Sequence, residues 1–154
     1  MRVTPADRPA LGPRLAALER LATYPLGRDT FQLDHGPDYF AFLDRLGAEV
    51  DYRVALEQDE VVAVGAGVLR SVPLRAGEAA VRAWYGADLK VHPQHRGRRI
   101  PLRLLGRAFP WNYLRCPRGY GISMDPGDGR ANPVVRLMGR WRWSPLRLAT
   151  TLVL

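Results

Sequence analysis

Apolar residues fall at two different spacings along the first half of the chain, and each spacing predicts a different kind of element. Within 13–23 they recur three or four positions apart, which predicts an amphipathic helix with Pro13 in its first turn. The same spacing over 37–46 predicts a second helix, and Gly47 is placed to end it.

Runs that alternate between apolar and polar residues, or that are rich in β-branched residues, predict strands. Three of them would form consecutive strands of a meander, at 50–57, 61–72 and 79–91. The polar stretch 58–60 suits a tight hairpin between the first two strands. Gly65 and Gly67 weaken the second strand and are typical of a bulge. Residues 1–5 predict a short strand at the start of the chain.

The second half of the chain predicts a helix followed by shorter and less regular elements. The helix would end near Phe109, because Pro110 follows it. Pro110 and Pro117 would bracket an irregular segment that contains Trp111, Tyr113 and Cys116. The remaining predicted elements are a strand at 120–124, a helix at 132–140 and a strand at 146–154.

The order of these elements predicts an α/β (α+β) fold with a central, mostly antiparallel twisted sheet of about six strands, flanked by about four helices. With 154 residues the chain can build one sizeable core, so we expect a single domain over 1–154. No apolar run approaches the roughly 20 residues needed to cross a bilayer. Charges interrupt the N-terminal stretch where a signal peptide would be apolar. We therefore expect a cytoplasmic protein without a membrane span.

Charge is distributed unevenly along the chain, whose formal net charge is +8. Residues 1–92 carry 11 Lys and Arg against 13 Asp and Glu, whereas 93–154 carry 12 Arg against 2 Asp. This asymmetry predicts an anionic partner for the second half: nucleic acid, an anionic lipid surface or a phosphorylated cofactor. The chain holds 22 arginines and one lysine, so part of the positive charge reflects a compositional bias.

The stretch 87–109 combines a strand, a turn at His92-Pro93, the basic loop 96–99 and the start of a helix. The first backbone N–H groups of a helix have no internal partner, and the helix dipole favours negative charge there. Arginine side chains beside that end can bind phosphate oxygens with two donors each. The stretch therefore predicts a phosphate site.

The segment Val91–Pro101, with Arg96 in its centre, resembles the pyrophosphate loop of the GNAT superfamily of N-acetyltransferases. Ala131–Leu137 is similar to the Asn-containing late helix of that family, and the order of elements agrees over nearly the whole chain. Two positions depart from the family pattern: Arg99 stands where glycine is usual, and Pro101 replaces another small residue. Glycine lets the backbone approach a diphosphate closely, so the loop is divergent.

The resemblance implies that acetyl-CoA is the acyl donor and that a small-molecule or peptide amine accepts the acetyl group directly. The backbone of Leu89 and Val91 would hold the pantetheine arm. The implied diphosphate contacts are Arg96, Gly97, Arg98, Arg99 and Ile100. Asn132 would contact the cofactor, although Asn before Pro133 is equally a helix N-cap.

Asp88, Tyr85 and His35 are the candidate catalytic residues. Asp88 and Tyr85 could each serve as base, water relay or acid, yet regular pleating places them on opposite faces of a strand unless a bulge intervenes. The structural alternative is a hydrogen-bonding Asp88 and a core Tyr85. His35 could be a base or contact the acceptor, or it could be an exposed turn residue beside Asp38, which would then cap the helix.

Other readings stay open beside this one. A tyrosine that the family often uses as general acid is missing from 137–139, and the chain has one strand after its last helix where the family has two, so the domain would lack the last family strand. These departures allow a catalytically degenerate CoA-binding domain. A basic nucleic-acid-binding module is the other alternative, but the arginines are scattered over several elements, which makes a nucleic-acid partner the weaker hypothesis. A homodimer is left open.

A metal site is not expected, and neither is chemistry at cysteine. His92 and His95 lack a carboxylate or cysteine at ligand spacing. The single cysteine, Cys116, excludes an internal disulfide, and we expect it to be a packed residue.

Overall fold

The computed structural model describes residues 1–26, 29–47, 49–73, 75 and 77–122. The chain divides into two compact parts, one formed by 1–23 and 31–122 and the other by 24–30 and 123–154. The elements predicted at 132–140 and 146–154, together with Asn132, lie outside the described residues.

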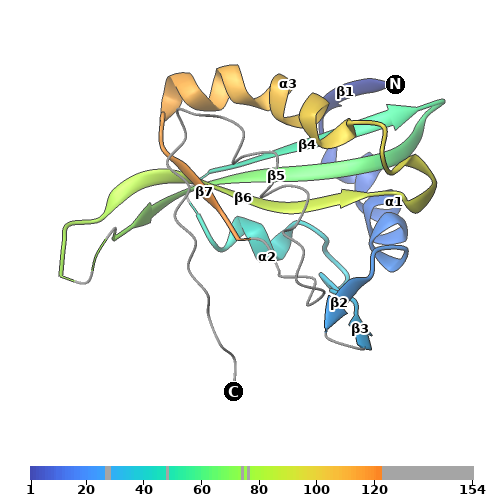
Figure 1. Cartoon of the computed structure of the whole chain (residues 1–154), viewed down its shortest axis with the longest axis horizontal. Coiled ribbons are helices and arrows are strands. Elements are labelled where there is room, and N and C mark those ends of the chain that lie inside the picture. Colours follow the sequence, from blue (N-terminus) through green and yellow to red (C-terminus); the bar gives the residue numbers. More distant parts are fainter. Residues whose placement is uncertain (27–28, 48, 74, 76, 123–154) are drawn as a thin grey trace. The chain divides into compact units, whose positions relative to one another are not determined.

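A five-stranded sheet forms the centre of the first part, in the order β1-β4-β5-β6-β7 (Figure 1). Its strands are β1 (Arg2–Pro5), β4 (Glu49–Glu57), β5 (Glu60–Val72), β6 (Val81–Val91) and β7 (Gly119–Gly121). The first four pair antiparallel and β7 pairs parallel to β6, which confirms the predicted mostly antiparallel sheet. Two short strands, β2 (Tyr24–Leu26) and β3 (Asp29–Phe31), pair separately with each other.

Helices cover both faces of the five-stranded sheet, with α3 on one side and α2 on the other (Figure 1). Leu15 of α1 (Arg8–Arg20) is completely buried in a cluster with Val54 and Val64. Ile100 of α3 (Ile100–Arg115) is buried against Ala63 on the opposite face. Alternation of apolar side chains along β4 and β5 therefore fills two separate cores.

Two helices begin or end at different residues from those predicted. α1 begins at Arg8, so Pro9 occupies its first turn and Pro13 lies inside it. α3 continues to Arg115 through Pro110, and the segment around Trp111 is therefore helical rather than irregular. A proline inside a helix removes one backbone bond, to the residue four positions earlier, and packing of the remaining face can offset that loss.

The second predicted helix is short. α2 spans only Ala41–Asp44, because the residues before it form a turn in which the Asp38 carboxylate accepts a hydrogen bond from the Phe40 N–H at 3.0 Å. Cys116 is buried, as expected, and its thiol donates to the Arg82 carbonyl. Among the described residues no helix is long and apolar enough to cross a membrane.

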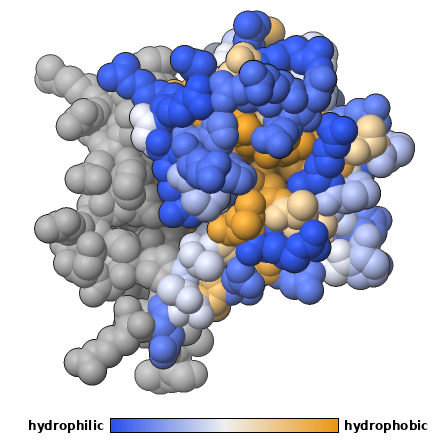
Figure 2. All heavy atoms as spheres, turned by 90° about the vertical axis from the view of Figure 1, so that its right-hand side faces the viewer, coloured by the Kyte–Doolittle hydropathy of each residue, from blue (hydrophilic) through white to orange (hydrophobic). Residues whose placement is uncertain are grey.

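The turn between β4 and β5 and the loop that follows β6 lie at the same end of the sheet, on the right in Figure 1. Gln58 and Asp59 form the turn, and both have positive φ, as a two-residue hairpin turn of this kind requires. Seen from this end of the sheet, hydrophilic residues lie around an area of hydrophobic residues (Figure 2).

Candidate functional site

A bulge in β6 determines which side chains of that strand share a face. Val64 of β5 pairs with Lys90 and Ala66 pairs with Ala87, so two β6 residues, Asp88 and Leu89, stand opposite Gly65 alone. Asp88 takes up the extra residue with a φ of 53°, in the left-handed region. The irregularity lies at Gly65, where the sequence predicted it, but the additional residue belongs to β6.

This bulge brings Tyr85 and Asp88 to the same face of the sheet, the condition that sequence analysis set for a shared site. Tyr85 packs against the core cluster beneath α1, and its ring stacks on Tyr120 of β7 with centroids 5.1 Å apart. Asp88 accepts a hydrogen bond from Tyr39 Oη at 2.6 Å on that side of the sheet. Leu89 points the other way, where its side chain approaches Gly65 from the α3 face.

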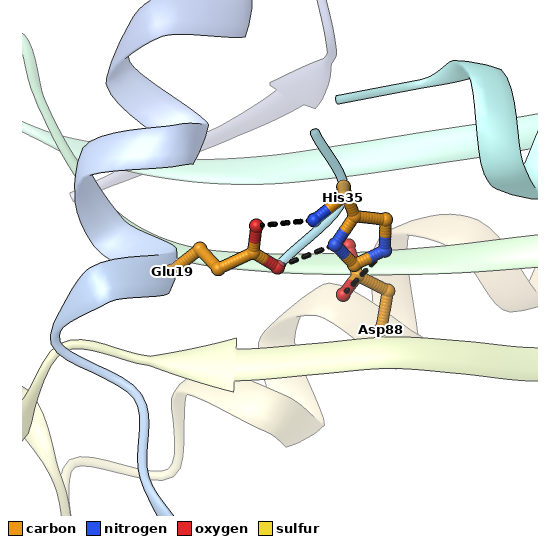
Figure 3. Close-up of side chains that lie close together, drawn as sticks. All are labelled: Glu19, His35 and Asp88. Atoms are coloured by element: carbon orange, nitrogen blue, oxygen red, sulfur yellow. Dashed lines mark hydrogen bonds and ion pairs between the residues drawn. The ribbon is translucent and has the colours of Figure 1, made fainter. Parts of the chain in front are cut away.

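His35 lies between two buried carboxylates, those of Glu19 on α1 and Asp88 on β6 (Figure 3). Its Nδ1 contacts Glu19 Oε1, its backbone N–H donates to Glu19 Oε2 at 3.0 Å, and its Nε2 lies 3.8 Å from Asp88 Oδ1. The three side chains are 8%, 6% and 3% exposed. His35 is therefore a buried member of a cluster, not an exposed turn residue.

Lys90 completes this cluster, and sequence analysis missed it. Its ammonium lies 3.0 Å from Glu19 Oε1, pairs with Asp88 Oδ1 and donates to Tyr39 Oη at 3.2 Å. The Lys90 side chain is 0% exposed. The available signal was compositional: a chain with 22 arginines places its one lysine here.

Hydrogen bonds within the cluster favour the ionised form of Glu19. Burial alone would raise the pKa of Glu19, but hydrogen bonds from the His35 backbone and from Lys90 outweigh it and lower that pKa. Burial, together with the charge of Asp88, raises the pKa of Tyr39, so its hydroxyl stays protonated and donates. The imidazole therefore lies between two carboxyl groups, and the Lys90 side chain contacts both of them.

Glu19, His35 and Asp88 also form the type of ligand set that binds metal ions, with ligand atoms within 4.8 Å of one another. However, the Lys90 ammonium contacts both carboxylates. A divalent ion would have to displace this buried cation, so we assign the cation position to Lys90.

The arrangement can perform proton transfer. Glu19 contacts Nδ1 much more closely than Asp88 approaches Nε2, so the tautomer of the uncharged imidazole that this geometry favours has its hydrogen on Nδ1. This leaves the lone pair of Nε2 directed to the side where Asp88 lies. A carboxylate that orients one imidazole nitrogen, with no hydrogen bond at the other, is a geometry that suits a general base.

Among the described strands, one edge of β6 is only partly paired beside this cluster. β7 pairs with β6 only at Trp84, Tyr85 and Gly86. Within the described part of the chain no strand pairs with Leu89 or Val91 on that edge. Their peptide groups are therefore available to a ligand that lies along the strand.

The loop after β6 leads directly into α3. Gly97 and Arg99 both have positive φ, at 79° and 55°, and Arg99 is the residue that precedes the first turn of the helix. The position where the family pattern has glycine is thus one where the backbone is left-handed, which explains the preference for glycine there. Ile100 is buried and anchors the helix start.

The arginines of this loop are not equivalent. Arg98 donates to both carboxylate oxygens of Glu57 on β4, at 2.7 and 2.8 Å, which lowers the pKa of Glu57. Arg96 and Arg99 are exposed and form no ion pair with another described residue. Of the three arginines predicted to contact the diphosphate, Arg98 therefore points to the sheet, whereas Arg96 and Arg99 face outward.

Comparison with known proteins gives matches in structure only. No protein-family model matches the chain, and no curated protein matches it. The structure is similar to the aminoglycoside 6'-N-acetyltransferase from Acinetobacter haemolyticus, with 15% identity, 100% of this chain and 96% of that chain covered, and a TM-score of 0.64.

Two further solved structures agree with this likeness. A predicted acetyltransferase from Clostridium acetobutylicum, solved with acetyl-CoA, is 17% identical, with 97% of this chain and 95% of that chain covered and a TM-score of 0.62. An acetyltransferase from Trypanosoma brucei is 16% identical, with 99% of both chains covered and a TM-score of 0.62.

Proposed function

Because the chain has the fold of the GNAT acetyltransferases, we propose that it is an acyl-CoA-dependent N-acetyltransferase that transfers the acetyl group of acetyl-CoA directly to a primary amine. Structures with this fold include one solved with acetyl-CoA and others solved with coenzyme A. Fold alone does not determine function, so the proposal rests on the residues of the site.

One observation carries the proposal. The β6 bulge brings Asp88 beside His35, the proposed base, which Glu19 contacts, and β7 pairs with no residue of β6 beyond Gly86. An acyl thioester along that edge and an amine approaching from the α1 face would meet at Asp88. Proximity of this kind contributes much of the rate enhancement in group transfer.

Donor binding would use the backbone more than side chains. The peptide groups of Leu89 and Val91 would bind the pantetheine arm, and the N–H groups at the start of α3 would bind the diphosphate. Arg96 and Arg99 would add charge-assisted hydrogen bonds. Arg98, held by Glu57, would position the loop instead of contacting phosphate.

His35 would remove the proton from the acceptor ammonium at Nε2, directly or through one water molecule. The freed amine forms the new N–C bond to the thioester carbonyl carbon, the C–S bond breaks, the nitrogen loses its additional proton to solvent, and the thiolate takes a proton, which gives the amide and the CoA thiol. Tyr85, on the same face and beside the point where β6 and β7 separate, is the proposed donor of that proton. Asp88 would attract the ammonium and hold it near the base.

A small-molecule amine is the proposed acceptor. A hollow of about 260 Å³ on the α1 and α2 face is lined by Arg8, Pro9, Asp38, Phe40 and Asp44. Asp44 is held by Arg8, whereas the Asp38 carboxylate meets only backbone among the described residues. Similar structures include aminoglycoside 6'-N-acetyltransferases, which supports a small-molecule acceptor. Cytoplasmic location and a homodimer stay predictions.

Calorimetric titration with acetyl-CoA, followed by thiol-release assays over aminoglycosides, polyamines and peptides, tests the proposal. We expect binding that Arg96→Ala weakens by about tenfold, because one charge-assisted contact is lost. The matched control, Arg75→Ala, changes an exposed arginine away from the loop and should leave binding unchanged. Absence of acetyl-CoA binding contradicts the proposal. Binding without thiol release for any amine identifies a CoA-binding domain without activity.

A further inference from the structure

A row of arginines runs along helix α3, and only the first of them takes part in the proposed acetyl transfer. Arg99, Arg103 and Arg107 follow one another at four-residue intervals, and all three are exposed. With a rise of 1.5 Å per residue, successive members lie about 6 Å apart along the helix axis. Sequence analysis regarded the arginines as scattered, but the length of α3 gathers these three into one row.

No acidic side chain among the described residues neutralises the positive charges of this row. None of its three members forms an ion pair there. The acidic residues of the neighbouring strand β4 are already engaged, Glu57 by Arg98, Glu49 by Arg115 and Asp51 by Arg53. Unpaired like charges at this spacing repel one another, so a multivalent anion would stabilise them.

A hollow opens beside two members of the row. It measures about 710 Å³, lies between the edge strand β1 and α3, and is lined by Met1, Arg2, Val3, Arg103, Gly106 and Arg107. Gly106 has no side chain, and nothing lies within 4 Å of the place where its Cβ would be. The surface of α3 is therefore recessed between Arg103 and Arg107. Arg2 adds a third guanidinium group from the opposite wall.

An aromatic residue continues the row. Trp111 follows Arg107 by another four residues and is 56% exposed. The Arg115 guanidinium lies 5.5 Å from its ring centroid, which adds positive charge at this end. An exposed indole beside a basic groove is a platform on which a nucleic-acid base can stack.

We propose that this face of the protein binds single-stranded nucleic acid, with phosphates along Arg103, Arg107 and Arg2 and a base on Trp111. A small anion would need one arginine pair and not a row, and an acidic peptide has no group that requires the indole. A duplex keeps its bases stacked inside, whereas a single strand offers them to the tryptophan. Guanidinium groups match phosphate oxygens with two donors each.

The test measures fluorescence anisotropy of labelled oligo(U) and oligo(dT) of about 15 nucleotides with the full chain, from about 50 to 200 mM salt. Each phosphate contact with a single strand contributes about 0.7 to the slope of log affinity against log salt, so three contacts predict a slope near −2. Comparison of the two probes shows whether the surface prefers RNA or DNA. Either probe, or both, binding with this slope supports the proposal.

Three variants identify the surface. Arg103→Glu/Arg107→Glu should weaken binding by at least about tenfold and reduce the slope by about 1.4. Trp111→Ala should weaken binding by about tenfold without changing the slope, because stacking releases no counterions. The control Arg45→Glu/Arg75→Glu changes net charge equally through exposed arginines elsewhere and should have a much smaller effect.

Thermal unfolding and acetyl-CoA titration of each variant report whether the fold is intact. The proposal fails if neither oligonucleotide binds at the lower salt concentration. It fails equally if the Arg103/Arg107 double variant and the Arg45/Arg75 control weaken binding to the same extent, because binding would then follow net charge. The proposal also fails if poly-aspartate displaces the oligonucleotide and Trp111→Ala has no effect. These two results together would indicate that the surface binds acidic proteins instead.

Discussion

Lys90 is the only lysine of a chain with 22 arginines, and its side chain is completely buried. Its compact ammonium contacts Glu19, Asp88 and Tyr39 at once. A guanidinium group is larger and planar, and it would present its donors in a fixed fork. Position 90 therefore has lysine, in a chain that otherwise uses arginine, because the site fits a compact ammonium group.

Replacing Lys90 tests this residue's part in stability. Lys90→Met should lower the free energy of unfolding by about 3–5 kcal/mol, because it leaves buried carboxylates without their cation. Lys90→Arg keeps the charge but overfills the site, and should cost about 1–3 kcal/mol. Urea unfolding gives both values, with the exposed Arg45→Met as control. A Lys90→Met protein as stable as the wild type would contradict the account.

Glu19 should make stability depend on acid pH. Its pKa in the folded protein lies below the ordinary value of 4.5, because hydrogen bonds from His35 and Lys90 outweigh the effect of burial. The stabilisation is thus fully present above the unfolded pKa and is lost as the pH falls through the lower folded pKa. Glu19→Gln should flatten the fall in unfolding free energy below about pH 5. Parallel curves for the two proteins would exclude this contribution.

Arg99 holds a backbone conformation that favours glycine, with φ at 55° and its side chain exposed. Arg99→Gly should raise the free energy of unfolding by about 1 kcal/mol, since glycine adopts this region without the clash of a Cβ. Arg103→Gly is the matched control inside the helix, where the same change should cost about 1 kcal/mol. Thermal unfolding separates the two, and a loss of stability in Arg99→Gly would be the contrary result.

At the scale of elements, the bulge of β6 is the feature on which the site depends. Deleting Leu89 would restore regular pairing, with Asp88 opposite Gly65 and Lys90 still opposite Val64. Because side chains alternate, Asp88 would then point to the α3 face while Lys90 stayed on the α1 face. The deletion should abolish amine-dependent thiol release.

Leu89→Ala is the control for this deletion, because it keeps the extra residue and hence the bulge. We expect it to retain more than about half of the wild-type rate, since only the Leu89 backbone takes part in the proposed site. Circular dichroism and thermal unfolding show whether each protein is folded. A folded deletion variant with wild-type activity would refute the role of the bulge.

Strands were predicted more accurately than helices, for a physical reason. The meander of β4, β5 and β6 follows from alternation and β-branched residues, which constrain a strand along its whole length. Helix ends depend on packing that local patterns do not contain. Pro110 predicted an end, yet α3 continues beyond it, and Asp38 forms a turn where a helix was expected to begin.

At the scale of the whole molecule, the cluster joins positions far apart in the sequence. Asp88 and His35 were predicted from the resemblance to GNAT acetyltransferases, but nothing local connects Glu19 or Lys90 with them. Glu19 lies on a helix whose other inward residues are apolar, and only tertiary structure shows that it is buried beside His35. The pairing of Arg98 with Glu57 across 41 residues was equally out of reach.

The most direct test of the central claim is amine-dependent release of CoA thiol by the wild type and by His35→Gln. We expect the wild type to acetylate at least one amine of the panel. We also expect His35→Gln to lower kcat/KM for that amine by about 10²–10⁴-fold, because the general base is lost. Affinity for acetyl-CoA, measured by calorimetry, should stay within about twofold, since His35 lies outside the donor loop. Equal rates for the two proteins, or no acetylation by the wild type, would contradict the account.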